Sequence, residues 1–182
     1  HYWDPHTPYR TPADYPSQFA DTPLPDDWID EKTFEEHLLH IGPHCANEIN
    51  MWNDDTFPQW PKHPGKLTTL EHLLDLYDGG VKYTDDNIGQ IIGWLKDNGL
   101  YDDDLAIIIT ADHGEDLGEF GIYGEHGTAD EPVCRIPMIV RWPGMQKGAV
   151  VKGFYDNTDL TPTVQELLGT PMFSDRYHYD GS

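Results

Sequence analysis

The spacing of apolar residues predicts a long helix in the middle of the chain. Between residues 70 and 95 the apolar side chains recur at helical intervals, with Thr68 or Thr69 placed to cap the start and Asn98 and Gly99 at the end. This apolar face consists of Leu70, Leu73, Leu74, Tyr77, Val81, Ile88, Ile91, Ile92 and Leu95. The pattern is the clearest helix signal in the sequence.

Two short apolar runs predict strands. Residues 105–110 are continuously apolar and rich in Ile, which is typical of a strand covered on both faces. Residues 136–142 form the second run, with Pro137 confined to its beginning. Shorter helices are predicted over residues 25–39 and 159–169. The order helix, strand, loop, strand, helix predicts an α/β sheet with helices on its faces.

Prolines mark two irregular segments. Residues 1–30 contain six prolines among several aromatic residues, which predicts an ordered loop that packs on a surface. Residues 53–66 predict a second proline-rich loop. The length of 182 residues is that of one domain. Because the chain lacks an initiator Met and its first residues read as the end of a strand, we expect it to be a fragment of a longer protein.

The chain is strongly acidic, with 33 Asp and Glu against 11 Lys and Arg and a formal net charge of −22. Such a field repels polyanions and anionic membrane surfaces, so we expect neither nucleic-acid binding nor membrane association. No apolar run approaches the roughly 18 residues that a membrane span requires. An anionic substrate remains compatible with this charge, because a bound metal reverses the field locally.

The two cysteines, Cys45 and Cys134, lie far apart and form no CxxC pair. The sequence therefore predicts neither a zinc cluster nor a disulfide framework. We interpret Cys134 as a small buried residue at the start of a strand.

Candidate chemistry gathers in residues 110–127, which begin where the first predicted strand ends. Ligands of open α/β sheets bind beyond the carboxyl ends of strands. Asp112 offers a carboxylate oxygen and His113 an imidazole nitrogen, a pair suited to a divalent cation. Both reach one ion only if the backbone turns, and Gly114 permits a turn. A hydrogen-bonded structural pair is the alternative, but the preceding strand and the five glycines that follow favour a metal site.

The same region resembles the carboxyl-terminal metal motif of the sulfatase family, within the alkaline phosphatase superfamily. The runs that carry the resemblance are residues 110–115, 124–127 and 135–144, with further agreement in residues 4–9, 77–86 and 155–163. The resemblance implies an α/β fold with an alkaline phosphatase-like mixed sheet flanked by helices, present here only in part. It also implies that residues 1–182 are a fragment of a single sulfatase-like catalytic domain.

In that family a divalent metal, usually calcium, is held by two amino-terminal acids, an Asp and a neighbouring Asn, Gln or His. The last two map onto Asp112 and His113, and an imidazole ligand also suits manganese or zinc. The resemblance places His6 where the family has a histidine that contacts the sulfate or assists the leaving group. His126 stands where many members have Lys. It either contacts the anion, which we favour, or is a further metal ligand.

The family nucleophile is a formylglycine made from Cys or Ser in a Cys/Ser-x-Pro/Ala-x-Arg motif, which this chain lacks. Residues 134–137, Cys-Arg-Ile-Pro, do not match that motif, and the two amino-terminal acids have no counterpart. We therefore expect the isolated chain to be inactive. The other histidines are interpreted as surface or packing residues: His37, His40, His44, His63, His72 and His178.

Three functions follow from this interpretation. The first is hydrolysis of a sulfate monoester of a small molecule or carbohydrate, with His6 and His126 as catalytic and substrate-binding residues. The second keeps the site and changes the substrate to a phosphate or phosphonate ester. The third is a catalytically silent fragment or a binding module that uses the fold alone. No feature of the sequence specifies the cellular compartment or the oligomeric state.

Overall fold

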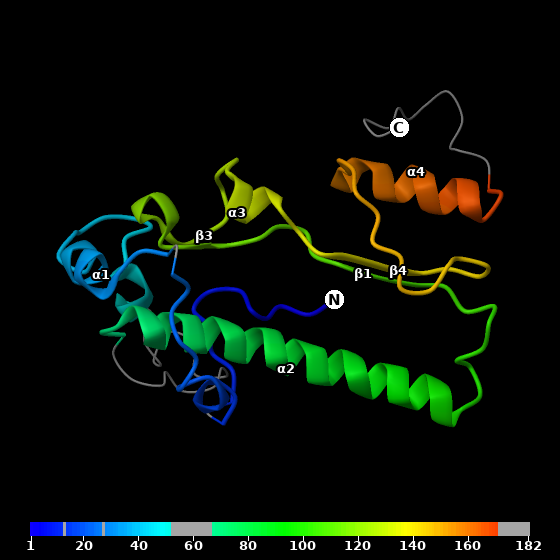
Figure 1. Ribbon diagram of the computed structural model, residues 1–182, viewed down its shortest axis with the longest axis horizontal. Coiled ribbons are helices and arrows are strands. Elements are labelled where there is room, and N and C mark those ends of the chain that lie inside the picture. The colour runs from blue at the N-terminus through cyan, green and yellow to red at the C-terminus, as the bar shows by residue number, and fades with distance from the viewer. Residues whose placement is uncertain (13, 27, 52–66, 171–182) are drawn as a thin grey trace. The chain divides into compact units, whose positions relative to one another are not determined.

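A computed structural model describes residues 1–12, 14–26, 28–51 and 67–170 (Figure 1). These residues belong to two compact units, His1–Pro143 and Gly144–Ser182. The elements of the first unit are the 3₁₀ helices η1 (Pro16–Gln18), η2 (Glu48–Met51) and η3 (Glu119–Gly121), the helices α1 (Glu31–His37), α2 (Leu70–Asp97) and α3 (Glu131–Cys134), and the strands β1 (Ile107–Thr110), β2 (Asp116–Leu117), β3 (Tyr123–Glu125) and β4 (Met138–Arg141). The loop predicted over residues 53–66, like His63 and His178, lies outside the described residues.

The long helix α2 confirms the prediction from apolar spacing. It begins after Thr69, whose side chain accepts a hydrogen bond from the His72 N–H at 3.2 Å. It ends at Asp97, and Gly99 takes the left-handed conformation with φ of +68° just beyond the end. Apolar spacing and end signals together therefore located both ends to within a residue or two.

The core of the first unit forms around the first turns of α2. Burial of its apolar side chains removes them from water and stabilises the unit. Its buried members are Tyr9, Phe34, Ala46, Leu67, Leu70, Leu73, Leu76, Leu117 and Tyr123. They come from the amino-terminal loop, α1, the segment between α1 and α2, α2 itself and the β2–β3 pair, so one core holds together segments that are distant in the sequence.

Helix α1 is shorter than the helix predicted over residues 25–39. Asp30 sets its start, because the Asp30 carboxylate accepts a hydrogen bond from the Thr33 N–H at 2.8 Å. The Glu31 carboxylate accepts from the N–H groups of Leu70 and Glu71, both at 3.2 Å. The first residue of α1 thus satisfies orphan donors at the start of α2 and fixes one helix against the other.

Strands β1 and β4 form an antiparallel pair in the register Ile107↔Arg141 to Thr110↔Met138. Both lie within the runs predicted as strands, and Pro137 immediately precedes β4. The expectation that the first strand is covered on both faces is wrong for the described residues. The sheet has two strands there, β1 is half-buried, and Ile139 of β4 is 62% exposed.

The glycine-rich segment after β1 folds into an element that the sequence did not predict. Strands β2 and β3 pair antiparallel, joined through η3, where Gly118 and Gly121 adopt positive φ angles of 120° and 74°. Helix α3 was also missed. Cys134 is its last residue and is exposed, so the interpretation of a buried cysteine at a strand start is wrong.

The second unit contains α4 (Asn157–Leu167), near the helix predicted over residues 159–169. Asp156 and Asp159 form a reciprocal capping box at its start, which moves the first turn two residues earlier than predicted. Gly169, with φ of +64°, follows its end. In the described parts of both units, no helix combines the length and apolar character needed to cross a membrane.

Candidate active site

Three histidines from distant parts of the sequence meet in the first unit. The ring centroids of His113 and His126 lie 4.1 Å apart, with the rings nearly parallel at 14°. His6 approaches them edge-on, at 4.8 Å from His126 and 6.3 Å from His113. The structure therefore brings together the three histidines that the sequence analysis singled out.

His6 lies on an amino-terminal loop that is fixed at several points. The Thr84 hydroxyl of α2 donates to the Asp4 carbonyl at 3.0 Å, and the Thr7 hydroxyl donates to the Gly124 carbonyl of β3 at 3.3 Å. A Cβ at Gly80 would lie 2.7 Å from the Cβ of Pro5, so the loop packs directly on the backbone of α2. These contacts fix the loop on both sides of His6.

Asp112 and His113 follow β1 and turn their side chains toward each other. The Asp112 Oδ2 and the His113 Nε2 are 3.8 Å apart, and the His113 N–H donates to Asp112 Oδ1 at 3.2 Å. Adjacent residues of an extended strand would face opposite ways, so the backbone does turn here. The two side chains are thus able to contact a common ion.

Gly114 is needed at this turn for space. Its N–H donates to the Val133 carbonyl at 2.7 Å, and a Cβ at this position would lie 2.0 Å from the Pro132 carbonyl oxygen. Its φ is not among the positive values. The sequence argument therefore identified the right glycine, but close approach to α3 rather than an unusual conformation makes it necessary.

His126 follows β3 and is oriented by a buried carboxylate. Its Nδ1 lies 3.2 Å from Glu115 Oε1, and the Glu115 side chain is only 5% exposed. The His126 N–H donates to Glu125 Oε1 at 2.8 Å, and the other oxygen of Glu125 pairs with His44. Glu115 therefore positions the ring, and Glu125 fixes the backbone that carries it.

The three imidazoles share one feature: each Nδ1 lies beside an oxygen. The partners are the Thr7 carbonyl at 2.7 Å for His6, the Gly114 carbonyl at 2.9 Å for His113 and Glu115 at 3.2 Å for His126. A carbonyl accepts and does not donate, so His6 and His113 carry their proton on Nδ1. Their Nε2 atoms are left to accept a proton or bind a metal, the arrangement usual for metal-ligating histidines.

Burial governs the electrostatics of this cluster. It raises the pKa of Glu115 to about 7, although His6 and His113 act in the opposite direction. Burial, and then the neighbouring His113, lower the pKa of His126. For Glu125 burial acts upward, but the N–H groups of His126 and Gly127 outweigh it and lower the pKa of that carboxyl. The cluster thus contains two groups whose pKa values are shifted in opposite directions, Glu115 upward and His126 downward.

The donor chemistry of Asp112 and His113 fits two positions of a metal site. One hard carboxylate oxygen and one imidazole with an available Nε2 suit calcium, manganese or zinc. Among the described residues, no group of three or more His, Cys, Asp and Glu side chains is arranged to hold a metal. The side chains that the structure describes therefore offer part of a coordination shell.

Comparison with known proteins identifies the family of the chain. The sulfatase family model matches residues 1–170. The chain belongs to the sulfatase family. Over 181 residues it is 29% identical to a multifunctional alkaline phosphatase superfamily protein, PehA, of Trinickia caryophylli, a match that covers 96% of this chain and 34% of that protein. It is 34% identical over 139 residues to the extracellular sulfatase SULF-1 homolog of Drosophila melanogaster, covering 76% of this chain and 12% of that protein.

A solved structure supports the fold. The phosphonate monoester hydrolase SpPMH from Silicibacter pomeroyi superposes with a TM-score of 0.60 at 28% identity, covering 92% of this chain and 32% of that one. The fold is therefore alkaline phosphatase-like, an α/β arrangement of helices and strands that is present here in part, as the motifs implied. The chain spans about a third of the length of PehA and of SpPMH.

Within this sulfatase-family chain, sequence reasoning missed the carboxylates behind the histidines. Glu115 lies inside the quoted motif, but its buried side chain behind His126 depends on the β2–β3 pair, which was not predicted. His44 was interpreted as a surface or packing residue, and it pairs with Glu125 next to His126. His37 does pack, because its Nδ1 lies 2.7 Å from the hydroxyl of buried Tyr123.

Proposed function

We propose that this chain forms the metal and anion part of an active site that hydrolyses sulfate monoesters of small molecules or carbohydrates. The single observation that carries the proposal is the convergence of Asp112 and His113 with His6 and His126 beyond the end of β1. Membership of the sulfatase family supports the reaction type.

Asp112 and His113 are the proposed metal ligands, with calcium as the preferred ion and manganese or zinc as alternatives. When bound, such an ion supplies positive charge that neutralises ester oxygens. His113 is prepared for this role, since the Gly114 carbonyl holds its Nδ1 proton and leaves Nε2 on the side of Asp112. Asp112 contributes the carboxylate from the residue beside it, 3.8 Å away between Oδ2 and Nε2.

His6 and His126 are the proposed groups that act on the ester itself. The Thr7 carbonyl accepts the Nδ1–H of His6, which leaves Nε2 for the substrate. In its imidazolium form, His6 donates the Nε2 proton to the departing alkoxide. Because burial lowers the pKa of His126 and raises that of Glu115, His126 is neutral, its Nδ1 accepts from the Glu115 carboxyl and its Nε2–H donates to a sulfate oxygen, which makes Glu115 its positioning residue. The formylglycine nucleophile of the family is proposed to come from residues other than these 182.

The test is turnover of an aryl sulfate by the protein that contains this chain. We expect Asp112→Ala and His6→Ala each to reduce kcat/KM by at least about a hundredfold, the scale of a lost charge-stabilising or proton-transfer group. His40→Ala is the matched control, because His40 is exposed and its ring lies beside His37, which is not part of the three-histidine cluster. Unchanged turnover in Asp112→Ala would contradict the proposal.

Phosphonate or phosphate ester hydrolysis is the second candidate. It is favoured by the similarity to a phosphonate monoester hydrolase structure over 92% of the chain. Paired assays with aryl sulfate, aryl phosphate and aryl phosphonate esters, at equal metal content, separate the two reactions. If none of the three esters is hydrolysed, the chain is the silent fragment or binding module described above.

A further inference from the structure

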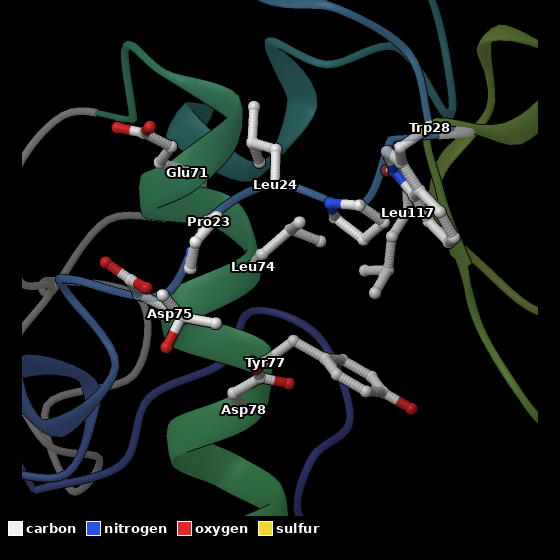
Figure 2. Close-up of a pocket in the computed structure, with 11 residues that line it drawn as sticks. Pro23, Leu24, Trp28, Glu71, Leu74, Asp75, Tyr77, Asp78 and Leu117 are labelled. Atoms are coloured by element: carbon white, nitrogen blue, oxygen red, sulfur yellow. The ribbon is translucent and has the colours of Figure 1, made fainter.

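A pocket of about 240 Å³ opens beside the first turns of α2, and the proposed reaction makes no use of it (Figure 2). One part of its lining is apolar, formed by Leu24 and Trp28 from the segment before α1, Leu74 from α2 and Leu117 from β2. The Trp28 Nε1–H donates to the Leu117 carbonyl at 3.4 Å, which keeps the indole beside that leucine. This wall joins elements that already share the core.

The other part of the lining is acidic. Glu71, Asp75 and Asp78 lie along one side of α2, and Figure 2 shows the carboxylates of Glu71 and Asp75 on the opposite side from Trp28 and Leu117. None of the described residues that line the pocket is Lys, Arg or His. Burial raises the pKa of both Asp75 and Asp78, so these carboxylates are partly withdrawn from water.

The pocket is separate from the three-histidine cluster. Tyr77 lines it, and the Tyr77 ring packs against the ring of Tyr9 with centroids 5.9 Å apart. Tyr9 is fully buried and belongs to the loop that carries His6. None of His6, His113 and His126 lines the pocket, which meets the His6 loop only through this aromatic contact among the described lining residues.

We propose that this pocket binds a small organic cation with an apolar body, such as an aryl- or alkylammonium ion. The apolar body packs against Leu74, Leu117 and the Trp28 ring, where it loses contact with water. The ammonium group lies toward Asp75 and Asp78, whose burial makes an opposite charge more favourable there than in open solvent. The inference stands whether or not the proposed hydrolase function does, because it uses none of the same side chains.

The probe for this site is 2-phenylethylammonium, titrated into the full chain and followed by two-dimensional NMR. We expect the largest shifts at the Trp28 indole N–H and at the methyl groups of Leu74 and Leu117. Neutral 2-phenylethanol has the same apolar body, and we expect it to bind about tenfold more weakly, as two lost charge interactions would require. Anionic phenylacetate is expected to cause no shifts at these groups.

A matched pair of variants separates the pocket from the general acidity of the chain. The double substitution Asp75→Asn with Asp78→Asn should weaken binding of the ammonium about tenfold. Asp85→Asn, an exposed position on the same helix outside the pocket, should change it less than twofold. Equal binding of the ammonium and the alcohol, or shifts centred elsewhere, would overturn the inference, and both are measured on the unaltered chain.

Discussion

The two halves of α2 have similar apolar patterns but very different surroundings. In the first half, Leu70, Leu73 and Leu76 are fully buried, and Gly80 contacts Pro5 of the loop that carries His6. In the second half, Ile91 is 50% exposed and Trp94 is 59% exposed. The difference shows that helical spacing identifies the face suited to burial, whereas the segments that pack on that face decide whether burial occurs.

The same contrast bears on function. The contacts that fix the His6 loop to α2 include Tyr9 on Tyr77, Pro5 on Gly80 and Asp4 on Thr84, towards the end of the packed half. The core there also includes Leu117 and Tyr123, which belong to the β2–β3 pair that precedes His126. The candidate site is therefore supported by the half of α2 that has a core.

The largest difference is expected when one apolar side chain is removed from each half. Leu73→Ala creates a cavity in the core and should lower the free energy of unfolding by about 2–5 kcal/mol. Ile91→Ala should lower it by less than about 1 kcal/mol, because half of that side chain already contacts water. Urea denaturation of both variants measures the values. Equal losses would mean that the second half is buried to the same degree.

Asp116, a buried carboxyl in β2, should make the free energy of unfolding depend on pH in a way that exposed acids do not. Asp116 is fully buried, and burial raises its pKa from 3.8 to about 6. Because the folded pKa is the higher one, stability that Asp116 provides below pH 4 is lost as the pH rises through 6. Between pH 4 and pH 7 this group should therefore lower the free energy of unfolding by about 2–3 kcal/mol. In Asp116→Asn that decrease should be absent.

The measurement is the free energy of unfolding at pH 4 and pH 7 for both proteins. Asp97→Asn, near the exposed end of α2, is the control and should leave the slope unchanged. If Asp116→Asn kept the full slope between pH 4 and pH 7, the titration would have to come from other groups.

Glycine substitutions give the smallest effects and the sharpest contrast, because their sign should differ between the halves. Gly80→Ala forces a Cβ against Pro5 at 2.7 Å and should cost about 1–3 kcal/mol. Gly89→Ala meets nothing within 4 Å and should stabilise the helix by about 0.5–1 kcal/mol. Thermal unfolding followed by circular dichroism distinguishes the two. Destabilisation by Gly89→Ala would show that a neighbour packs on the second half.

The sequence predicted α2, β1, β4 and α4 because each has a local signal: apolar periodicity, a β-branched run, or a cap. Its prediction that β1 is covered on both faces was wrong, because coverage depends on residues far away in the chain. It also missed β2 and β3, since strands of two and three residues carry too short a pattern and are held by Gly118 and Gly121 in left-handed conformations.

For the candidate site too, some residues could be predicted from the sequence and others could not. Asp112 and His113 were recognisable because they follow an apolar run directly, and His6 and His126 because their motifs resemble a family. The partners that orient them were not recognisable, since the pairing of Glu115 with His126 and of His44 with Glu125 depends on how loops fold onto the core. The residue types of the site can be recognised in the sequence, whereas the contacts that orient them form only in the folded chain.

The central claim is that Asp112 and His113 bind a common cation, and paramagnetic broadening by Mn²⁺ tests it most directly. In the full chain, low concentrations of Mn²⁺ should broaden the NMR signals of His113 first, and Asp112→Asn should abolish this while the exposed Asp103→Asn should not. Broadening that spreads evenly over the acidic surface, with no preference for His113 and no effect of Asp112→Asn, would contradict the account.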